Sequence, residues 1–175
     1  MTCVEKGIPY ELVPIDYGSD THGALHPFRR MPILEIDGTI IVETLAIVGH
    51  LAECFPGARL KPTDAAGLSR MRTWMSVCAD YLFTGVVRTV PRGRSITPEE
   101  RTTARTALER AEALIDADPF LVGDALTLAD LYLAPQLANC LEKAPELLDG
   151  LDGLTTWHDL MAERESFRLT AYELS

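Results

Sequence analysis

The sequence predicts an α/β domain over residues 1–57, followed by an all-helical domain over residues 65–175. Three observations support this division. Two short β-branched runs around an Asp-Gly pair predict a β-hairpin in the first part of the chain. Apolar residues at helical spacing fill most of the second part. Between the two parts, residues 58–64 follow a Phe-Pro-Gly turn and are typical of a linker.

Composition limits the class of protein. The 175 residues are enough for one or two small domains, and 47% apolar with 24% charged residues is typical of a soluble globular protein. A net charge of −10 repels phosphate backbones, so nucleic acid is not an expected partner. There is no signal-peptide pattern and no bilayer-length apolar run, and the four cysteines lack metal or disulfide spacing. We therefore expect a cytoplasmic protein with reduced thiols, no metal and no membrane contact.

The first 25 residues predict a helix end, a strand and a loop. Residues 1–6 are typical of the last turns of a helix, which Gly7 would end. Residues 9–15 alternate enough between apolar and polar side chains to predict a strand. Residues 18–25 predict a polar loop that can include one helical turn.

A hairpin is predicted directly after Met31. Its strands are residues 33–36 and 39–42, and the Asp-Gly pair between them suits a type I′ turn, in which both positions need positive φ. Pro32 stands at the first strand position, one of the few places in a sheet that tolerate a residue without an N–H. We expect a cis Met31–Pro32 bond, which would leave the N–H and C=O of Met31 free to pair with an extended peptide.

A helix is predicted to follow the hairpin. Thr44 can cap it, and apolar residues then recur at helical spacing. The free N–H groups of a helix N-terminus bind carboxylates, and Glu43 beside them can meet an ammonium group. Together with Met31, these two residues would suit a zwitterionic γ-glutamyl head joined to a short peptide.

The second half of the chain predicts amphipathic helices. The first long apolar stripe consists of Leu68, Met71, Met75, Cys78, Leu82 and Val86. Residues 90–93 are expected to end that helix, and residues 97–100, Thr-Pro-Glu-Glu, predict a capping box at the start of the next. Thr127 and Asp130 predict a second capping box, whose role is structural. The apolar positions of the last predicted helix are Leu154, Trp157, Leu160 and Met161.

These motifs carry a family resemblance. The run "HPFRRMPILEIDG…IIVETLAIVGHLAE" resembles the glutathione-binding half of the glutathione S-transferases. The box of Thr127 and Asp130 and the tail "RESFRLTAYELS" are similar to the helical domain of that family. The resemblance covers essentially the whole chain and implies a thioredoxin-like N-terminal domain followed by a helical bundle. The alternative is a fragment of another thioredoxin-like protein.

The resemblance implies a glutathione site. Its residues would be Met31 and Pro32 for the cysteinyl backbone, and Glu43 and Thr44 for the γ-glutamyl end. Arg30 would pair with the glycyl carboxylate or remain a solvated surface charge. His22 and His26 fall near this site, as solvated loop side chains or as contributors to it. Trp74 and Tyr81 are aromatic candidates for contact with the second substrate, although a helical stripe is more often core.

The resemblance also implies a departure from the family pattern. The first strand and most of the first helix of the family, roughly 20 residues, would precede Met1. The catalytic Tyr, Ser or Cys of the family lies in that piece, so the catalytic residue is unknown and expected upstream of Met1. Cys3 is a poor substitute, because a helix C-terminus disfavours an anion. Without that strand, residues 9–15 would pair directly with the hairpin, a partner chain would supply a strand, or the domain would loosen. In each case we expect little conjugation of glutathione.

Three classes of function follow from the resemblance. The first is a glutathione S-transferase that joins the glutathione thiolate to small hydrophobic electrophiles in detoxification. The second is a glutathione-binding or protein-interaction module without turnover. The third is a glutathione-dependent isomerase or dehalogenase. The resemblance further implies a homodimer, paired through the helix after Thr44 and the first long helix of the second domain.

Overall fold

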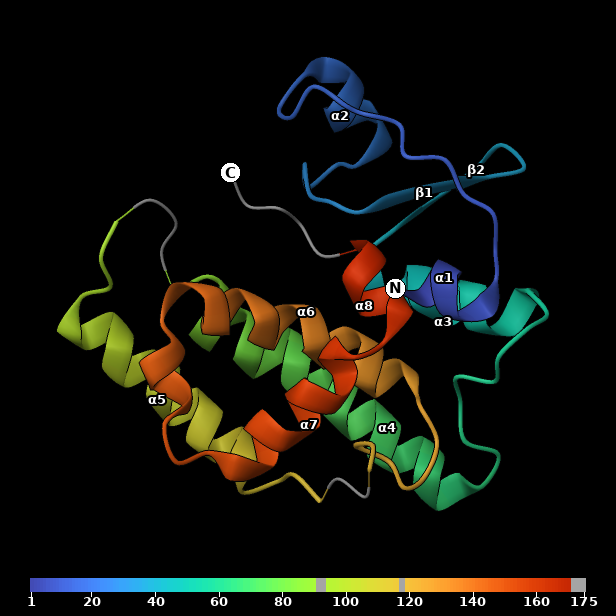
Figure 1. Ribbon diagram of the computed structural model, residues 1–175. Helices are drawn as coiled ribbons and strands as arrows, with labels where there is room; N and C mark the ends of the chain where they lie inside the picture. Colours follow the sequence, from blue (N-terminus) through green and yellow to red (C-terminus); the bar gives the residue numbers. More distant parts are fainter. Residues whose placement is uncertain (91–93, 117–118, 171–175) are drawn as a thin grey trace. The chain divides into compact units, whose positions relative to one another are not determined.

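The computed structural model describes residues 1–90, 94–116 and 119–170. Its elements fall into two compact units, Thr2–Arg59 and a C-terminal unit that begins at Leu60 (Figure 1). The elements of the first unit are α1 (Thr2–Lys6), α2 (Asp20–Leu25), β1 (Ile33–Ile36), β2 (Thr39–Val42) and α3 (Thr44–Cys54).

The hairpin forms as predicted. β1 and β2 pair antiparallel, with Ile33 opposite Val42 and Ile36 opposite Thr39. The turn residues Asp37 and Gly38 have φ values of 48° and 74°, the positive values that a type I′ turn requires.

Helix α1 ends at Gly7, whose φ of 66° is the left-handed conformation predicted for a helix C-terminus. The helix packs against α3. At its end the buried Lys6 donates a hydrogen bond from Nζ to the Ala58 carbonyl at 3.1 Å. Gly57 lies so close that a Cβ there would collide with the carbonyl oxygen of Lys6. These contacts tie the two ends of the unit together.

Residues 9–15 differ from the prediction. They are irregular backbone instead of a strand, and Leu12 and Val13 are 83% and 73% exposed. An alternating sequence suits an extended chain, but a strand also needs hydrogen bonds to a neighbour. Within the described ranges the sheet has only the strands β1 and β2, and neither pairs with this segment. The predicted strand is therefore wrong, and its direct pairing with the hairpin does not occur.

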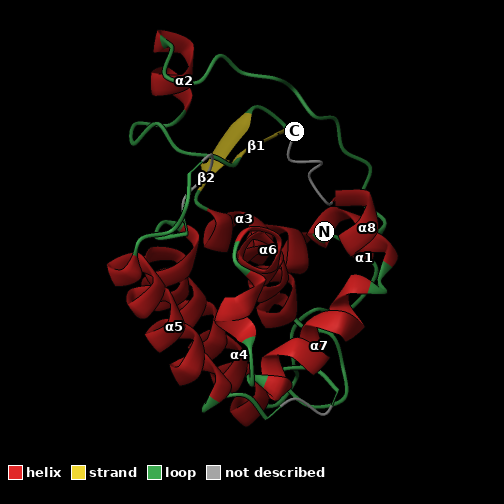
Figure 2. Cartoon of the chain, turned by 60° about the vertical axis from the view of Figure 1, so that its left-hand side comes forward, coloured by secondary structure: helices red, strands yellow, loops and turns green. Residues whose placement is uncertain are grey.

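The C-terminal unit is helical, as predicted. Its elements are α4 (Ala65–Val77), the π-helix η1 (Cys78–Val87), α5 (Pro98–Glu112), α6 (Leu128–Lys143), the 3-10 helix η2 (Pro145–Leu148), α7 (Asp152–Ala162) and α8 (Glu165–Thr170). Helix α6 is central: α4, η1, η2 and α7 all contact it, and Figure 2 shows it end-on among its neighbours. No helix in the described ranges is long and apolar enough to cross a membrane.

Both predicted capping boxes are confirmed. At the start of α5, the Thr97 hydroxyl accepts from the Glu100 N–H at 3.2 Å, and the Glu100 carboxylate accepts from the Thr97 N–H at 2.9 Å. At the start of α6, the Asp130 carboxylate accepts from the Thr127 N–H at 2.8 Å. The first long helix ends as η1 at Val87, before residues 90–93, which were predicted to end it; of these, residues 91–93 lie outside the described residues.

Candidate functional site

The strand register brings the predicted binding residues together. Ile33 lies opposite Val42, so the residues that flank this pair, Pro32 and Glu43, meet at one end of the hairpin. Met31 precedes the first strand there, and α3 begins immediately after Glu43. The segments 30–32 and 43–44, which hold the five predicted binding residues, thus adjoin the same end of the hairpin, and we call these five residues the cluster.

The backbone of Met31 is available to a ligand. The Met31–Pro32 bond is cis, as predicted, and Met31 is 53% exposed. Within the described part of the chain, neither its N–H nor its C=O has a backbone hydrogen-bond partner. A free donor and a free acceptor on one exposed residue can pair with an extended peptide.

The start of α3 is also open. Glu43 is the N-cap residue, with a φ of 70° and no hydrogen bond from its side chain to the helix. Thr44 is the first helical residue, so the prediction that Thr44 caps the helix is wrong. The first N–H groups of the helix therefore remain available for a carboxylate. A positive φ on a residue with a Cβ costs free energy, and such residues concentrate at functional sites.

Two neighbouring arginines have different roles. Arg29 has a φ of 50° and folds back, donating to the Gly18 carbonyl and lying 3.8 Å from a carboxylate oxygen of Asp20. The exposed Arg30 has no side-chain hydrogen bond or ion pair to any described residue. Arg30 is therefore the cation of this cluster that can receive a carboxylate.

His22 fixes the loop that carries Arg30. Its ring is fully buried, with Nδ1 accepting from the Gly18 N–H at 3.0 Å. Its Nε2 lies 3.0 Å from the Arg30 carbonyl, which can only accept, so Nε2 carries the proton. His26 is also fully buried, and its Nε2 lies 3.8 Å from Oε1 of Glu43. Solvated loop histidines were the simpler expectation, and that expectation is wrong.

The cysteines with perturbed acidity do not resemble activated nucleophiles. Burial raises the pKa of Cys3, which keeps its thiol protonated. Burial also raises the pKa of Cys78 to about 12 and that of Cys140 to about 11. We therefore assign no described cysteine to activation of the glutathione thiol. Within the same ranges, no group of three or more His, Cys, Asp or Glu side chains could hold a metal ion.

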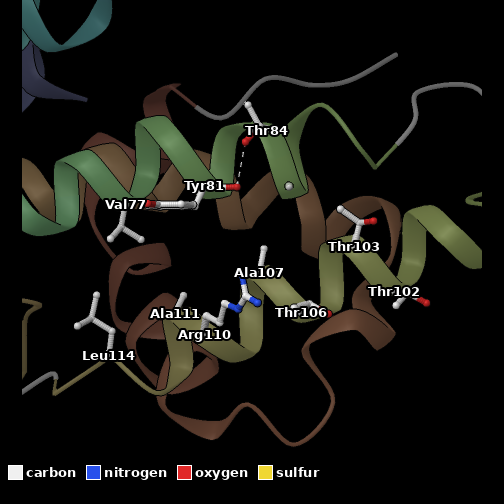
Figure 3. A pocket seen from close by; sticks show the side chains of 11 residues that line it. Val77, Tyr81, Thr84, Thr102, Thr103, Thr106, Ala107, Arg110, Ala111 and Leu114 are labelled. Carbon is white, nitrogen blue, oxygen red and sulfur yellow. Dashed lines mark hydrogen bonds between the residues drawn. The ribbon is translucent and has the colours of Figure 1, made fainter.

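A separate cavity of about 710 Å³ lies in the C-terminal unit between η1 and α5 (Figure 3). Tyr81, Arg110 and Leu114 line it together with several alanine and threonine side chains. Of the two aromatic candidates, Trp74 is core at 3% exposure, whereas Tyr81 is 64% exposed on the cavity wall.

Comparison with known proteins identifies the family. Residues 1–59 match the family model "Glutathione S-transferase, N-terminal domain", and residues 74–165 match the family model "Glutathione S-transferase, C-terminal domain". The chain belongs to the glutathione S-transferase family. The predicted family and the predicted two-part fold are thereby confirmed.

Two relatives from curated proteins illustrate the range of the family. The chain is 32% identical to the maleylacetoacetate isomerase of Mus musculus over 151 residues, 77% of this chain and 68% of that protein. It is 31% identical to the glutathione S-transferase GstA of Escherichia coli O157:H7 over 179 residues, 94% of this chain and 86% of that protein. Its relatives thus include both transferases and isomerases.

Solved structures show the same fold at lower identity. Glutathione transferase F7 from Populus trichocarpa superposes with a TM-score of 0.84 at 22% identity, over 96% of this chain and 88% of that one. A glutathione S-transferase from Methylobacillus flagellatus with glutathione bound gives a TM-score of 0.81 at 21% identity, over 97% and 90% of the two chains.

Proposed function

We propose that the N-terminal unit binds glutathione and that the protein is a glutathione S-transferase, which joins the glutathione sulfur to small hydrophobic electrophiles. The observation that carries the proposal is the free backbone of Met31 next to the uncapped N-terminus of α3. A peptide with a zwitterionic head needs both a backbone partner and an anion site. The residues at this end of the hairpin offer both.

Each part of glutathione has a partner of matching chemistry. The N–H and C=O of Met31 would pair with the cysteinyl backbone, which fixes the position of the thiol. The first N–H groups of α3 and the Thr44 hydroxyl would take the γ-glutamyl carboxylate. The Glu43 carboxylate would take the ammonium group, and Arg30 would pair with the glycyl carboxylate. The bound peptide supplies the reactive thiol; these residues hold and orient it.

The test is calorimetric titration of glutathione into the wild type and Glu43→Ala. A charge-assisted hydrogen bond contributes about 1.5–3 kcal/mol, so we expect binding to weaken roughly 10- to 150-fold. Glu35→Ala is the matched control, because Glu35 is an exposed glutamate on β1 of the same unit. Equal affinities for wild type and Glu43→Ala would mean that Glu43 is not the ammonium contact.

A second function is favoured by the relatives. Maleylacetoacetate isomerases and a maleylpyruvate isomerase from Ralstonia are among the proteins similar to this chain. The alternative proposal is therefore a glutathione-dependent isomerase acting on maleyl compounds. Two assays separate the candidates: conjugation to an activated aryl halide, and glutathione-dependent cis–trans conversion of maleylacetoacetate. Binding of glutathione with neither activity would favour a binding module.

We also propose that the protein is a homodimer. The support is the family membership together with exposed apolar side chains on η1 and in the segment that follows α5, where Tyr81 and Leu114 are 64% and 42% exposed.

A further inference from the structure

His26 is buried without a hydrogen bond. Its ring is 0% exposed, and within the described chain neither Nδ1 nor Nε2 has a hydrogen-bond partner. Buried polar side chains are nearly always satisfied, because an unpaired one forfeits its hydration. His22, four residues earlier, shows the usual arrangement, with both of its ring nitrogens paired. The unsatisfied ring of His26 therefore needs an explanation.

The position of the His26 ring is fixed by its own segment, and the ring lies beside Glu43. The backbone of His26 is anchored to α2, since its N–H donates to the His22 carbonyl at 2.9 Å. The ring of Phe28 packs against it edge to face, with 6.3 Å between centroids. Among the residues that the structure describes, the charged atom recorded beside the ring is Oε1 of Glu43, 3.8 Å from Nε2. That distance exceeds a hydrogen bond but can close by rotation of the Glu43 side chain.

Glu43 itself is loosely held. Its side chain is 64% exposed, and it has no hydrogen bond to the helix that it precedes. A glutamate in this setting samples several rotamers and loses that freedom when it binds a ligand. A neighbouring N–H that engages one carboxylate oxygen would reduce the loss by fixing the rotamer beforehand.

We propose that His26 is a positioning residue for Glu43: its Nε2–H donates to one carboxylate oxygen and leaves the other for the α-ammonium group of a γ-glutamyl ligand. The inference rests on the proposed glutathione site and adds a determinant of selectivity to it. The proton is on Nε2, because an Nε2 lone pair facing a carboxylate oxygen would be repulsive. The site would thus select peptides with a free α-amino group over those without one.

The experiment compares two ligands by calorimetry on the full chain: glutathione, and glutaryl-cysteinyl-glycine, the same peptide without its amino group. The ratio of the two affinities measures recognition of the ammonium. In His26→Phe, which keeps a ring but no N–H, we expect this ratio to fall about tenfold. In His26→Gln, whose amide nitrogen reaches close to the Nε2 position, we expect most of the selectivity to remain. A merely structural role would weaken both ligands equally and leave the ratio unchanged.

His158→Phe is the matched control. His158 is also buried, its Nε2 also lacks a hydrogen-bond partner among the described residues, and its ring packs edge to face on Phe167 in the C-terminal unit. In His158→Phe, we expect the ratio of the affinities for the two ligands to remain at the wild-type value. A parallel change in His158→Phe would overturn the inference, because the effect would then reflect the loss of any buried histidine.

The outcomes separate this inference from the proposed function. No binding of glutathione by the wild type would overturn the proposed function, and this inference with it. Selective binding by the wild type and an unchanged ratio in His26→Phe would overturn this inference alone. If His26→Phe fails to fold, the tautomer in the wild type decides. Nitrogen-15 NMR of the glutathione complex should show the proton of His26 on Nε2, and a proton on Nδ1 would overturn the inference.

Discussion

Asp130 shows how much one buried carboxylate can organise. Its Oδ1 accepts from the Leu121 N–H at 2.9 Å and from the Trp157 indole at 3.0 Å. Its Oδ2 accepts from the N–H and hydroxyl of Thr127 at 2.8 and 2.9 Å. The carboxylate is 0% exposed, so these four bonds replace its lost hydration. Asp130 thereby joins the segment before α6, the start of α6 and the middle of α7.

We expect Asp130→Asn to destabilise the protein by about 3 kcal/mol, because in either orientation the amide turns its NH2 toward at least one N–H group that can only donate. The measurement is urea unfolding followed by circular dichroism. Asp64→Asn is the control: Asp64 also caps a helix, accepting from the Gly67 N–H at 2.8 Å, but at an exposed site. If Asp64→Asn lowered the free energy of unfolding as much as Asp130→Asn, the buried hydrogen bonds of Asp130 would contribute no more to stability than an exposed helix cap.

At the level of elements, the start of α5 gives a prediction about pH. The Arg94 guanidinium beside Glu100, together with the N–H of Thr97, lowers the pKa of Glu100 to about 2 from its ordinary 4.5. A carboxyl group whose pKa is lower in the folded state stabilises that state above its ordinary pKa. This contribution is lost as the pH falls from about 4.5 to about 2.

We therefore expect Glu100→Gln to lower the melting temperature at pH 7 and to approach the wild type as the pH falls from 4.5 toward 2. Thermal melting of both proteins across this range provides the measurement. Glu99→Gln is the matched control on the same turn, because no described residue pairs with its side chain. It should follow the wild type at every pH. If the melting temperatures of Glu100→Gln and the wild type differed by the same amount at every pH, the lowered pKa of Glu100 would not be the cause of the stabilisation.

The elements that the sequence predicts correctly are those fixed by neighbours in the chain. The Asp-Gly turn sets the hairpin, and two capping boxes set the starts of α5 and α6. Residues 9–15 have the alternation of a strand, but a strand also depends on a partner that local pattern does not reveal.

The candidate site divides in the same way. Its residues and their order along the chain follow from motifs, whereas the burial of His22 and His26 depends on the packing around α2. The cap of α3 could not be predicted either, because Glu43 takes a left-handed φ that its residue type does not favour. Thr44 is a common capping residue and was the better local candidate.

At the scale of the whole molecule, the cavity between η1 and α5 is a candidate contact surface. The two helices approach closely at Gly85, where a Cβ would lie 2.9 Å from the Cβ of Ala107. Both residues line the cavity, and Figure 3 shows Ala107 on its α5 side. The exposed side chains of Tyr81 and Leu114 line the cavity. Exposed apolar side chains grouped around a hollow are typical of a surface that another protein covers. In a family member, we expect that protein to be a second copy of the chain.

We expect the wild type to be a dimer at micromolar concentration and Leu114→Asp to be a monomer. An aspartate in the cavity wall would have to lose its hydration at the interface, in a protein whose copies already repel each other with a net charge of −10. Light scattering after gel filtration measures both masses. Leu169→Asp on α8 is the control, because Leu169 is 64% exposed and does not line the cavity. It should remain dimeric. A monomeric wild type would rule out the homodimer, whereas dimers of all three proteins would place the interface on another surface.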